Sequence, residues 1–132
     1  MQRTFFVFIL FLSSNLLAMD CNREAKTFVV KMLNTSPRQP GEVMVFEPPV
    51  LRVCKGDTIH WTSNDYGHNS QSDIIPQGAA SWQGALNEDI KVTLNTKGTY
   101  IYQCSPHVFL GMLGIIVVET PTPNEAIAPA LR

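Results

Sequence analysis

Short runs of apolar residues, several of them alternating with polar ones, predict that this chain is built from β-strands. In the run 58–62, Ile59 and Trp61 fall on one face, and the run 90–94 alternates in the same way. Residues that favour turns, mainly Gly, Pro, Asn and Asp, separate the runs. The predicted strands are 28–33, 43–46, 50–53, 58–62, 90–94, 99–103 and 114–118. Short strands at this spacing predict an antiparallel sandwich.

The same pattern leaves little room for helix. The best helical candidate is 78–86, and Gly84 weakens it because glycine lowers helix stability. We therefore expect an all-β fold of about seven to eight strands with one short helix at most. Residues 120–132 contain three prolines and predict a flexible C-terminal tail.

The first 18 residues have the pattern of a secretory signal peptide. Arg3 supplies the positive start, an apolar run follows at 5–12, and Ala18 is a suitable cleavage point. The apolar run is shorter than the about 20 residues that a membrane-spanning helix needs. An uncleaved anchor is the alternative, and lipidation of Cys21 is disfavoured because Asp20 stands where a small residue should precede it. We expect one domain over residues 19–119.

Charge and cysteine content narrow the function. Charged residues make up 16% of the 132-residue chain, against roughly 25% in average soluble chains, and the net charge is −1. With no excess of basic residues, nucleic acid is not an expected partner. Export implies an oxidising compartment, where paired cysteines are the rule. After the signal-like segment the chain has three cysteines, Cys21, Cys54 and Cys104, so one of them must remain unpaired. The economical assignment is a Cys21–Cys54 disulfide and a separate role for Cys104.

Candidate metal ligands gather around Cys104. Cys104, His107 and Met112 fall within nine residues, in a loop between two predicted strands. Thiolate, imidazole and thioether form a soft ligand set that favours copper, and a methionine ligand argues against zinc. His68 is the best candidate for a fourth ligand. Two histidines and one cysteine with a weak axial methionine are typical of an electron-transfer copper site.

The segment 97–114 resembles the copper loop of the small cupredoxins. Its spacing Cys-x2-His-x4-Met matches pseudoazurins and plastocyanins, and further stretches resemble pseudoazurins in the same order along the chain. These stretches are 32–34, 44–48, 67–69, 75–79 and 86–88.

The resemblance implies a Greek-key β-sandwich of the cupredoxin type. It also implies that His68, Cys104, His107 and Met112 bind one type 1 copper ion in a periplasmic, monomeric carrier of single electrons. Pseudoazurins donate electrons to nitrite or nitrous oxide reductase, so redox proteins of this kind are the implied partners. Because four side chains would fill the coordination of copper, no position is left for a substrate, and we do not expect an enzyme. A periplasmic copper protein for metal delivery or storage is the alternative function.

The chain departs from the pseudoazurin pattern at two places. The family carries two C-terminal helices, whereas only the tail 120–132 follows here. The family also carries lysines around the copper edge, and the matching residues are neutral: Thr35, Tyr66, Gln83, Ala85 and Gln103. Apolar residues surround His107 at 106, 108–110 and 113. They could belong to the core or form a docking patch; if exposed, they would let contact burial, more than long-range charge, set partner affinity.

Residues near the ligands also have expected roles. Asn69 follows a ligand, so its backbone N–H can reach the sulfur of Cys104 and its side chain can bridge to Ser105. Strand alternation directs His60 toward solvent, opposite Trp61. Trp61 and Trp82 are expected to be packing residues.

Overall fold

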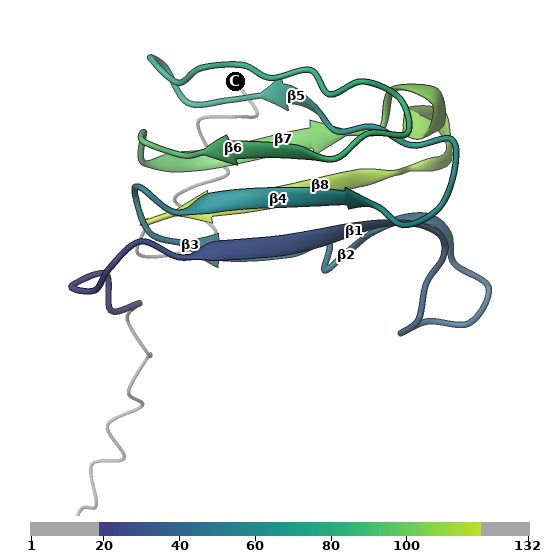
Figure 1. Ribbon diagram of the computed structural model, residues 1–132, viewed down its shortest axis with the longest axis horizontal. Coiled ribbons are helices and arrows are strands. Elements are labelled where there is room, and N and C mark those ends of the chain that lie inside the picture. Colours follow the sequence, from purple (N-terminus) through teal and green to yellow (C-terminus); the bar gives the residue numbers. More distant parts are fainter. Residues whose placement is uncertain (1–18, 120–132) are drawn as a thin grey trace, which may run out of the picture.

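Eight strands form two four-stranded sheets that pack face to face in the computed structural model, which describes residues 19–119 (Figure 1). The strands are β1 (Thr27–Thr35), β2 (Val43–Glu47), β3 (Val50–Val53), β4 (Thr58–Ser63), β5 (Gln71–Ile74), β6 (Ile90–Thr93), β7 (Gly98–Gln103) and β8 (Leu113–Val118). The all-β prediction is confirmed. The predicted signal peptide, 1–18, and the predicted tail, 120–132, lie outside the described residues.

The strand order is β2-β1-β4-β6 in one sheet and β3-β8-β7-β5 in the other. The chain crosses between the sheets, so β1 pairs with β4 in parallel and β3 pairs with β8 in parallel. The remaining pairs are antiparallel. The predicted sandwich is therefore present, but each sheet contains one parallel pair beside its antiparallel pairs. A parallel pair forms where the chain crosses to the other sheet and then returns in the same direction.

Two elements differ from the sequence prediction. Strand β5 was missed because its sequence, Gln-Ser-Asp-Ile, has little apolar character and forms a sheet edge. The helical candidate at 78–86 does not form a helix. Its backbone bonds to β5 and the residues before it instead: Gly84 N–H donates to Ser70 O at 2.8 Å, and Ser72 N–H donates to Trp82 O at 3.0 Å. The helix in the described part of the chain is the 3-10 helix η1 (Ser105–Leu110).

The core between the sheets is rich in aromatic rings. Phe46, Trp61, Tyr100 and Tyr102 are each at most 1% exposed, and Trp82 is 8% exposed. The tryptophans are therefore packing residues, as predicted. Tyr102 lies directly over Gly114 of the neighbouring strand, where an added Cβ would stand 2.1 Å from the tyrosine ring. Only glycine fits under this ring.

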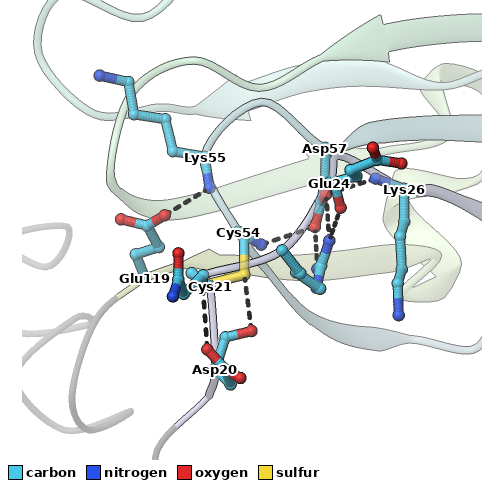
Figure 2. Close-up of polar contacts among 10 residues, drawn as sticks. Asp20, Cys21, Glu24, Lys26, Cys54, Lys55, Asp57 and Glu119 are labelled. Carbon is cyan, nitrogen blue, oxygen red and sulfur yellow. Dashed lines mark hydrogen bonds and ion pairs between the residues drawn. A yellow bond between two sulfur atoms is a disulfide. The ribbon is translucent and has the colours of Figure 1, made fainter.

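The N-terminal segment is fastened to the end of the sandwich opposite η1 (Figures 1 and 2). A disulfide joins Cys21 to Cys54 with 5.5 Å between their Cα atoms, which confirms the predicted pairing. Beside it, the fully buried carboxylate of Asp57 accepts hydrogen bonds from the Arg23 guanidinium and from the backbone N–H groups of Lys26 and Cys54. These contacts tie the first described residues to the turn after β3.

Asp57 is expected to make stability depend on pH. Burial by itself would raise its pKa, but the hydrogen bonds from Arg23, Lys26 and Cys54 outweigh it and lower the pKa to about 2, from 3.8. A carboxylate with a depressed folded-state pKa stabilises the fold above its unfolded pKa, and this stability is lost as the pH falls through the folded value. We expect a contribution of about 2 kcal/mol at neutral pH.

Urea unfolding at a series of pH values between 7 and 2 measures this contribution. The unfolding free energy of the parent protein should fall between pH 4 and 2 more steeply than that of Asp57→Asn. Asp73→Asn is the matched control, since Asp73 is exposed. Parallel pH profiles for the parent protein and Asp57→Asn would contradict the assignment.

Candidate metal centre

Three of the four predicted ligands lie on the connection between β7 and β8. Cys104 directly follows β7, His107 lies in η1, and Met112 directly precedes β8. Backbone hydrogen bonds close this loop on itself: Cys104 N–H donates to Met112 O at 3.1 Å, His107 N–H to Cys104 O at 3.0 Å, and Met112 N–H to His107 O at 3.3 Å. The loop is thus held as a compact turn that brings three soft donors to one end of the sandwich.

The residues at the two ends of η1 favour a helix with these boundaries. Pro106 stands at the start of the helix, where its missing N–H leaves no hydrogen bond unmade. Gly111 ends the helix with a φ of 82°, a left-handed conformation that favours glycine. These two residues fix where the loop enters and leaves the helix, and so the position of His107 between them.

The fourth predicted ligand, His68, approaches from the connection between β4 and β5. Its Nδ1 atom lies 3.7 Å from the sulfur of Cys104 and 3.2 Å from Nδ1 of His107, which itself lies 3.4 Å from that sulfur. The structure therefore brings these three donor atoms within 4.8 Å of one another. Met112 is fully buried, and its backbone bonds to both loop ligands.

His68 is held in position by a side chain that sequence reasoning did not single out. Its Nε2–H donates to Oδ1 of Asn34 at 2.9 Å, and the backbone N–H of Asn34 donates to the Asp65 carboxylate at 2.7 Å. Because Nε2 carries the proton, Nδ1 presents its lone pair to the cluster. Asn34 lies near the end of β1 and next to β4 in the sheet, and only the sheet pairing reveals that it reaches His68.

Asn69 links the two sides of the cluster, as predicted. Ser105 N–H donates to Asn69 Oδ1 at 2.8 Å, and Asn69 Nδ2 donates to the Ser105 hydroxyl at 3.0 Å and to Gly84 O at 3.2 Å. The backbone N–H of Asn69 also hydrogen-bonds the Cys104 sulfur. The cysteine loop and the His68 loop are therefore locked together.

The cluster disfavours charge on its own side chains. Burial raises the pKa of the Cys104 thiol, against the opposing effect of hydrogen bonds from the backbone of Asn69 and His107. Burial also lowers the pKa of His68, and the neighbouring His107 acts in the same direction. A soft cation that replaces the thiol proton would satisfy the buried sulfur, and the neutral imidazole of His68 is ready to bind it. This donor set fits copper.

The remaining candidates do not form a second centre. Cys21, Cys54 and Glu119 also gather within metal-binding distance, but the two sulfurs are joined in the disulfide. His60 is partly exposed and its Nε2 lies 3.1 Å from the Asp89 carboxylate, on the outer face that strand alternation predicts. Among residues 19–119, no helix has the length and apolar character to cross a membrane.

Comparison with known proteins places the chain in a family. Residues 32–119 match the model for copper binding proteins of the plastocyanin/azurin family. The chain is 35% identical to a pseudoazurin of Paracoccus pantotrophus over 111 residues, which cover 83% of this chain and 74% of the relative. It is 32% identical to a plastocyanin of Prochlorothrix hollandica over 121 residues, 84% of this chain and 87% of that one.

A solved structure agrees with the sequence relatives. The structure of a pseudoazurin from Sinorhizobium meliltoi superposes with a TM-score of 0.71 at 46% identity, covering 77% of this chain and 80% of that chain. Family model, relatives and fold thus coincide with a site that gathers copper-binding donors. The chain belongs to the copper-binding plastocyanin/azurin family as a cupredoxin of the pseudoazurin type: a blue copper protein that transfers electrons and is not an enzyme.

Proposed function

We propose that this chain is an exported carrier of single electrons in which His68, Cys104, His107 and Met112 hold one type 1 copper ion. The convergence of the donor atoms of His68, Cys104 and His107 carries the ligand assignment. The signal-like segment 1–18 and the Cys21–Cys54 disulfide support a periplasmic location, because disulfides persist in oxidising compartments. We also propose that the protein is a monomer and that it binds its redox partners only transiently.

The chain's own residues keep the site rigid. Copper, when bound, supplies the one-electron couple. Asn34 fixes the tautomer of His68, and Asn69 joins its loop to Ser105. Because these contacts do not depend on the charge of the centre, the ligands keep one arrangement in both oxidation states. His107, the partly exposed member of the cluster, offers its ring edge to a partner, and Gly67 leaves space beside that edge.

An apolar patch surrounds His107. We call it the docking patch and define it as Tyr66, Phe109, Leu110 and Leu113, which are 86%, 98%, 61% and 43% exposed. Exposed apolar residues gathered at one place indicate a surface for protein contact. The alternative, that the run 108–110 belongs to the core, does not fit the exposure of Phe109 and Leu110. A nitrite or nitrous oxide reductase with an apolar docking face is a suitable partner.

Leu110→Asp is expected to slow electron transfer to the physiological partner without changing the copper spectrum. A charge in the docking patch would have to lose its hydration when the two apolar faces meet, which weakens a small interface. Stopped-flow kinetics with the partner would show a rate constant about tenfold lower. Val29→Asp is the matched control, because Val29 is 48% exposed but lies near the start of β1, toward the end of the sandwich opposite η1 (Figure 1). Equal rates for Leu110→Asp and the control would place docking elsewhere.

Met112→Gln is expected to lower the reduction potential while leaving a blue protein. A thioether is a soft donor that favours Cu(I), and the amide oxygen of glutamine is harder and favours Cu(II). Voltammetry measures the potential, and visible absorption shows that the Cys104 bond is intact. Met44→Gln is the control, a methionine on β2 that packs against the core and is not among the proposed ligands. An unchanged potential in Met112→Gln would remove Met112 from the ligand set.

The experiment that separates a carrier from a delivery or storage protein is repeated redox cycling in the presence of a Cu(I) chelator. A carrier should recover its full visible absorption at each oxidation, since buried donors hold the ion in both states. A delivery protein should lose colour as Cu(I) passes to the chelator. Progressive bleaching would overturn the proposed function.

A further inference from the structure

Oxidisable aromatic rings form a continuous stack inside the sandwich. The ring centroids of Trp82 and Trp61 are 5.1 Å apart, and those of Trp61 and Tyr102 are also 5.1 Å apart. Trp61 and Tyr102 are completely buried, whereas Trp82 is 8% exposed and reaches the surface. The stack therefore runs from the protein surface at Trp82 to the centre of the core at Tyr102.

The inner end of the stack lies next to the metal cluster. Tyr100, Tyr102 and Cys104 are alternate residues along and just after β7, and all three are buried, so they point to the same interior face. Successive residues on one face of a strand are about 6.6 Å apart. The Tyr102 ring thus occupies the position next to the Cys104 thiolate, and the stack connects that ligand with the surface at Trp82.

The chemistry of the stack exceeds what packing requires. Leucine or phenylalanine could fill this volume, whereas indole and phenol are the uncharged side chains that lose an electron most easily. The indole N–H of Trp61 is buried without a hydrogen-bond acceptor. The Trp82 N–H donates only to a hydroxyl, that of Ser70, at 3.0 Å. An oxidised indole in this stack would keep its proton, and could then be restored by one electron alone.

We propose that Trp82, Trp61 and Tyr102 form an internal path along which an electron from Cu(I) repairs an oxidised tryptophan, a protective role in addition to electron transport. A radical oxidant removes one electron from Trp82 and leaves its cation radical. One electron then passes from Cu(I) through the Tyr102 ring and Trp61 to Trp82, so that copper is oxidised to Cu(II) and the indole is restored. No bond breaks and no proton moves.

The path is separate from the His107 exit, because it begins at Trp82 and reaches the cluster from the Cys104 side. It rests on the proposed function, since it needs the Cu(I) state of the centre. The donor of the carrier's normal cycle would return the copper to Cu(I), so repeated radical attacks could be repaired without any change to the protein.

Pulse radiolysis of the Cu(I) protein with azide radical tests the path. Trp61 and Trp82 are the two tryptophans of the whole chain, so any indole radical signal comes from the stack. A Tyr66→Phe background removes the exposed phenol of the docking patch. The indole radical absorption should decay at the same rate as the visible Cu(II) absorption appears, and this rate should not depend on protein concentration.

Variants then test each part of the stack. Trp82 also contacts Tyr102 directly, with ring centroids 6.3 Å apart, so both indoles lead to the Tyr102 ring. In the Tyr66→Phe background, Tyr102→Phe should slow the appearance of Cu(II) at least tenfold, because it removes the oxidisable ring that both indoles contact. Tyr100→Phe is the matched control and should stay within twofold, since Tyr100 contacts Trp82 at 6.2 Å but lies farther along β7 from Cys104. Equal rates in Tyr102→Phe and its parent, or a rate proportional to protein concentration, would overturn the proposal.

A second measurement does not depend on a folded Tyr102 variant. Under steady exposure to the radical, mass spectrometry should find several-fold less oxidised Trp82 in the Cu(I) protein than in the metal-free protein. Equal oxidation would contradict repair by copper. These failures are distinct from failure of the proposed function, which would appear as a protein that never turns blue with Cu(II) and would overturn both proposals.

Discussion

Cys104→Ser is expected to abolish the intense visible absorption of the Cu(II) protein. The absorption arises from charge transfer between thiolate and copper, and a serine hydroxyl is a harder, weaker donor that cannot supply it. The donor atoms of His68 and His107 would remain in place, because Asn34 and the loop hydrogen bonds hold them independently of the sulfur. We therefore expect loss of colour to be near complete even where some copper is still bound.

The three histidines of the chain supply a matched set of controls. His68→Ala removes a proposed ligand and should bleach the protein, and added imidazole should restore part of the colour by filling the vacated position. His60→Ala removes an imidazole that pairs with Asp89 on the outer face and should leave the spectrum unchanged. Metal content is measured beside absorption. A serine variant with full absorption, or bleaching by His60→Ala, would contradict the ligand assignment.

The candidate ligands could be predicted because most of the site is local in sequence. Cys104, His107 and Met112 lie on one short loop, and the strands on both sides have strong apolar patterns. The gathering of soft donors in that loop indicated copper before any fold was known. His68 lies outside that loop and was predicted as the best candidate for the fourth ligand from its place after the strand 58–62; the resemblance of the stretch 67–69 to pseudoazurins implied the same residue. The structure brings it to the same point.

What the sequence did not reveal depends on contacts between distant segments. The Asn34 bond to His68 exists only because β1 and β4 are paired in parallel, a pairing that no local pattern encodes. Strand β5 is a polar sheet edge whose hydrogen bonds come from β7 and from the segment near Trp82. Those same bonds hold 78–86 in a non-helical conformation, so the missed strand and the helical candidate that did not form have one cause.

The exposure of the docking patch also could not be predicted from the local sequence pattern. The run 108–110 is as apolar as the predicted strands, and sequence alone left open whether it belongs to the core or the surface. Helix η1 decides the matter, since it has no buried residue. Phe109 and Leu110 face outward because the helix holds His107 toward the cluster and leaves the following residues on the protein surface.

Removing the Cys21–Cys54 disulfide is expected to lower the free energy of unfolding by about 3–4 kcal/mol. The bridge closes a loop with a sequence separation of 33 residues, and the loop-entropy model gives a value of this size. The double variant Cys21→Ser, Cys54→Ser avoids leaving a lone reactive thiol. Urea unfolding measures the loss. The visible spectrum should not change, because the bridge lies at the end of the sandwich opposite the metal centre (Figure 1).

The hydrogen bonds of Asp57 determine how much unfolding free energy is lost when the disulfide is removed. Asp57 bonds to Arg23, Lys26 and Cys54, so it fastens the same two segments that the disulfide joins (Figure 2). Once the bridge is gone, the carboxylate has to hold those segments against the larger freedom of the N-terminal chain. We therefore expect the disulfide variant and Asp57→Asn to be non-additive, with a coupling energy above about 0.5 kcal/mol in a double-mutant cycle. Strict additivity would show that the two fastenings act independently, and a disulfide variant as stable as the parent would show that the Asp57 contacts alone secure the N-terminus.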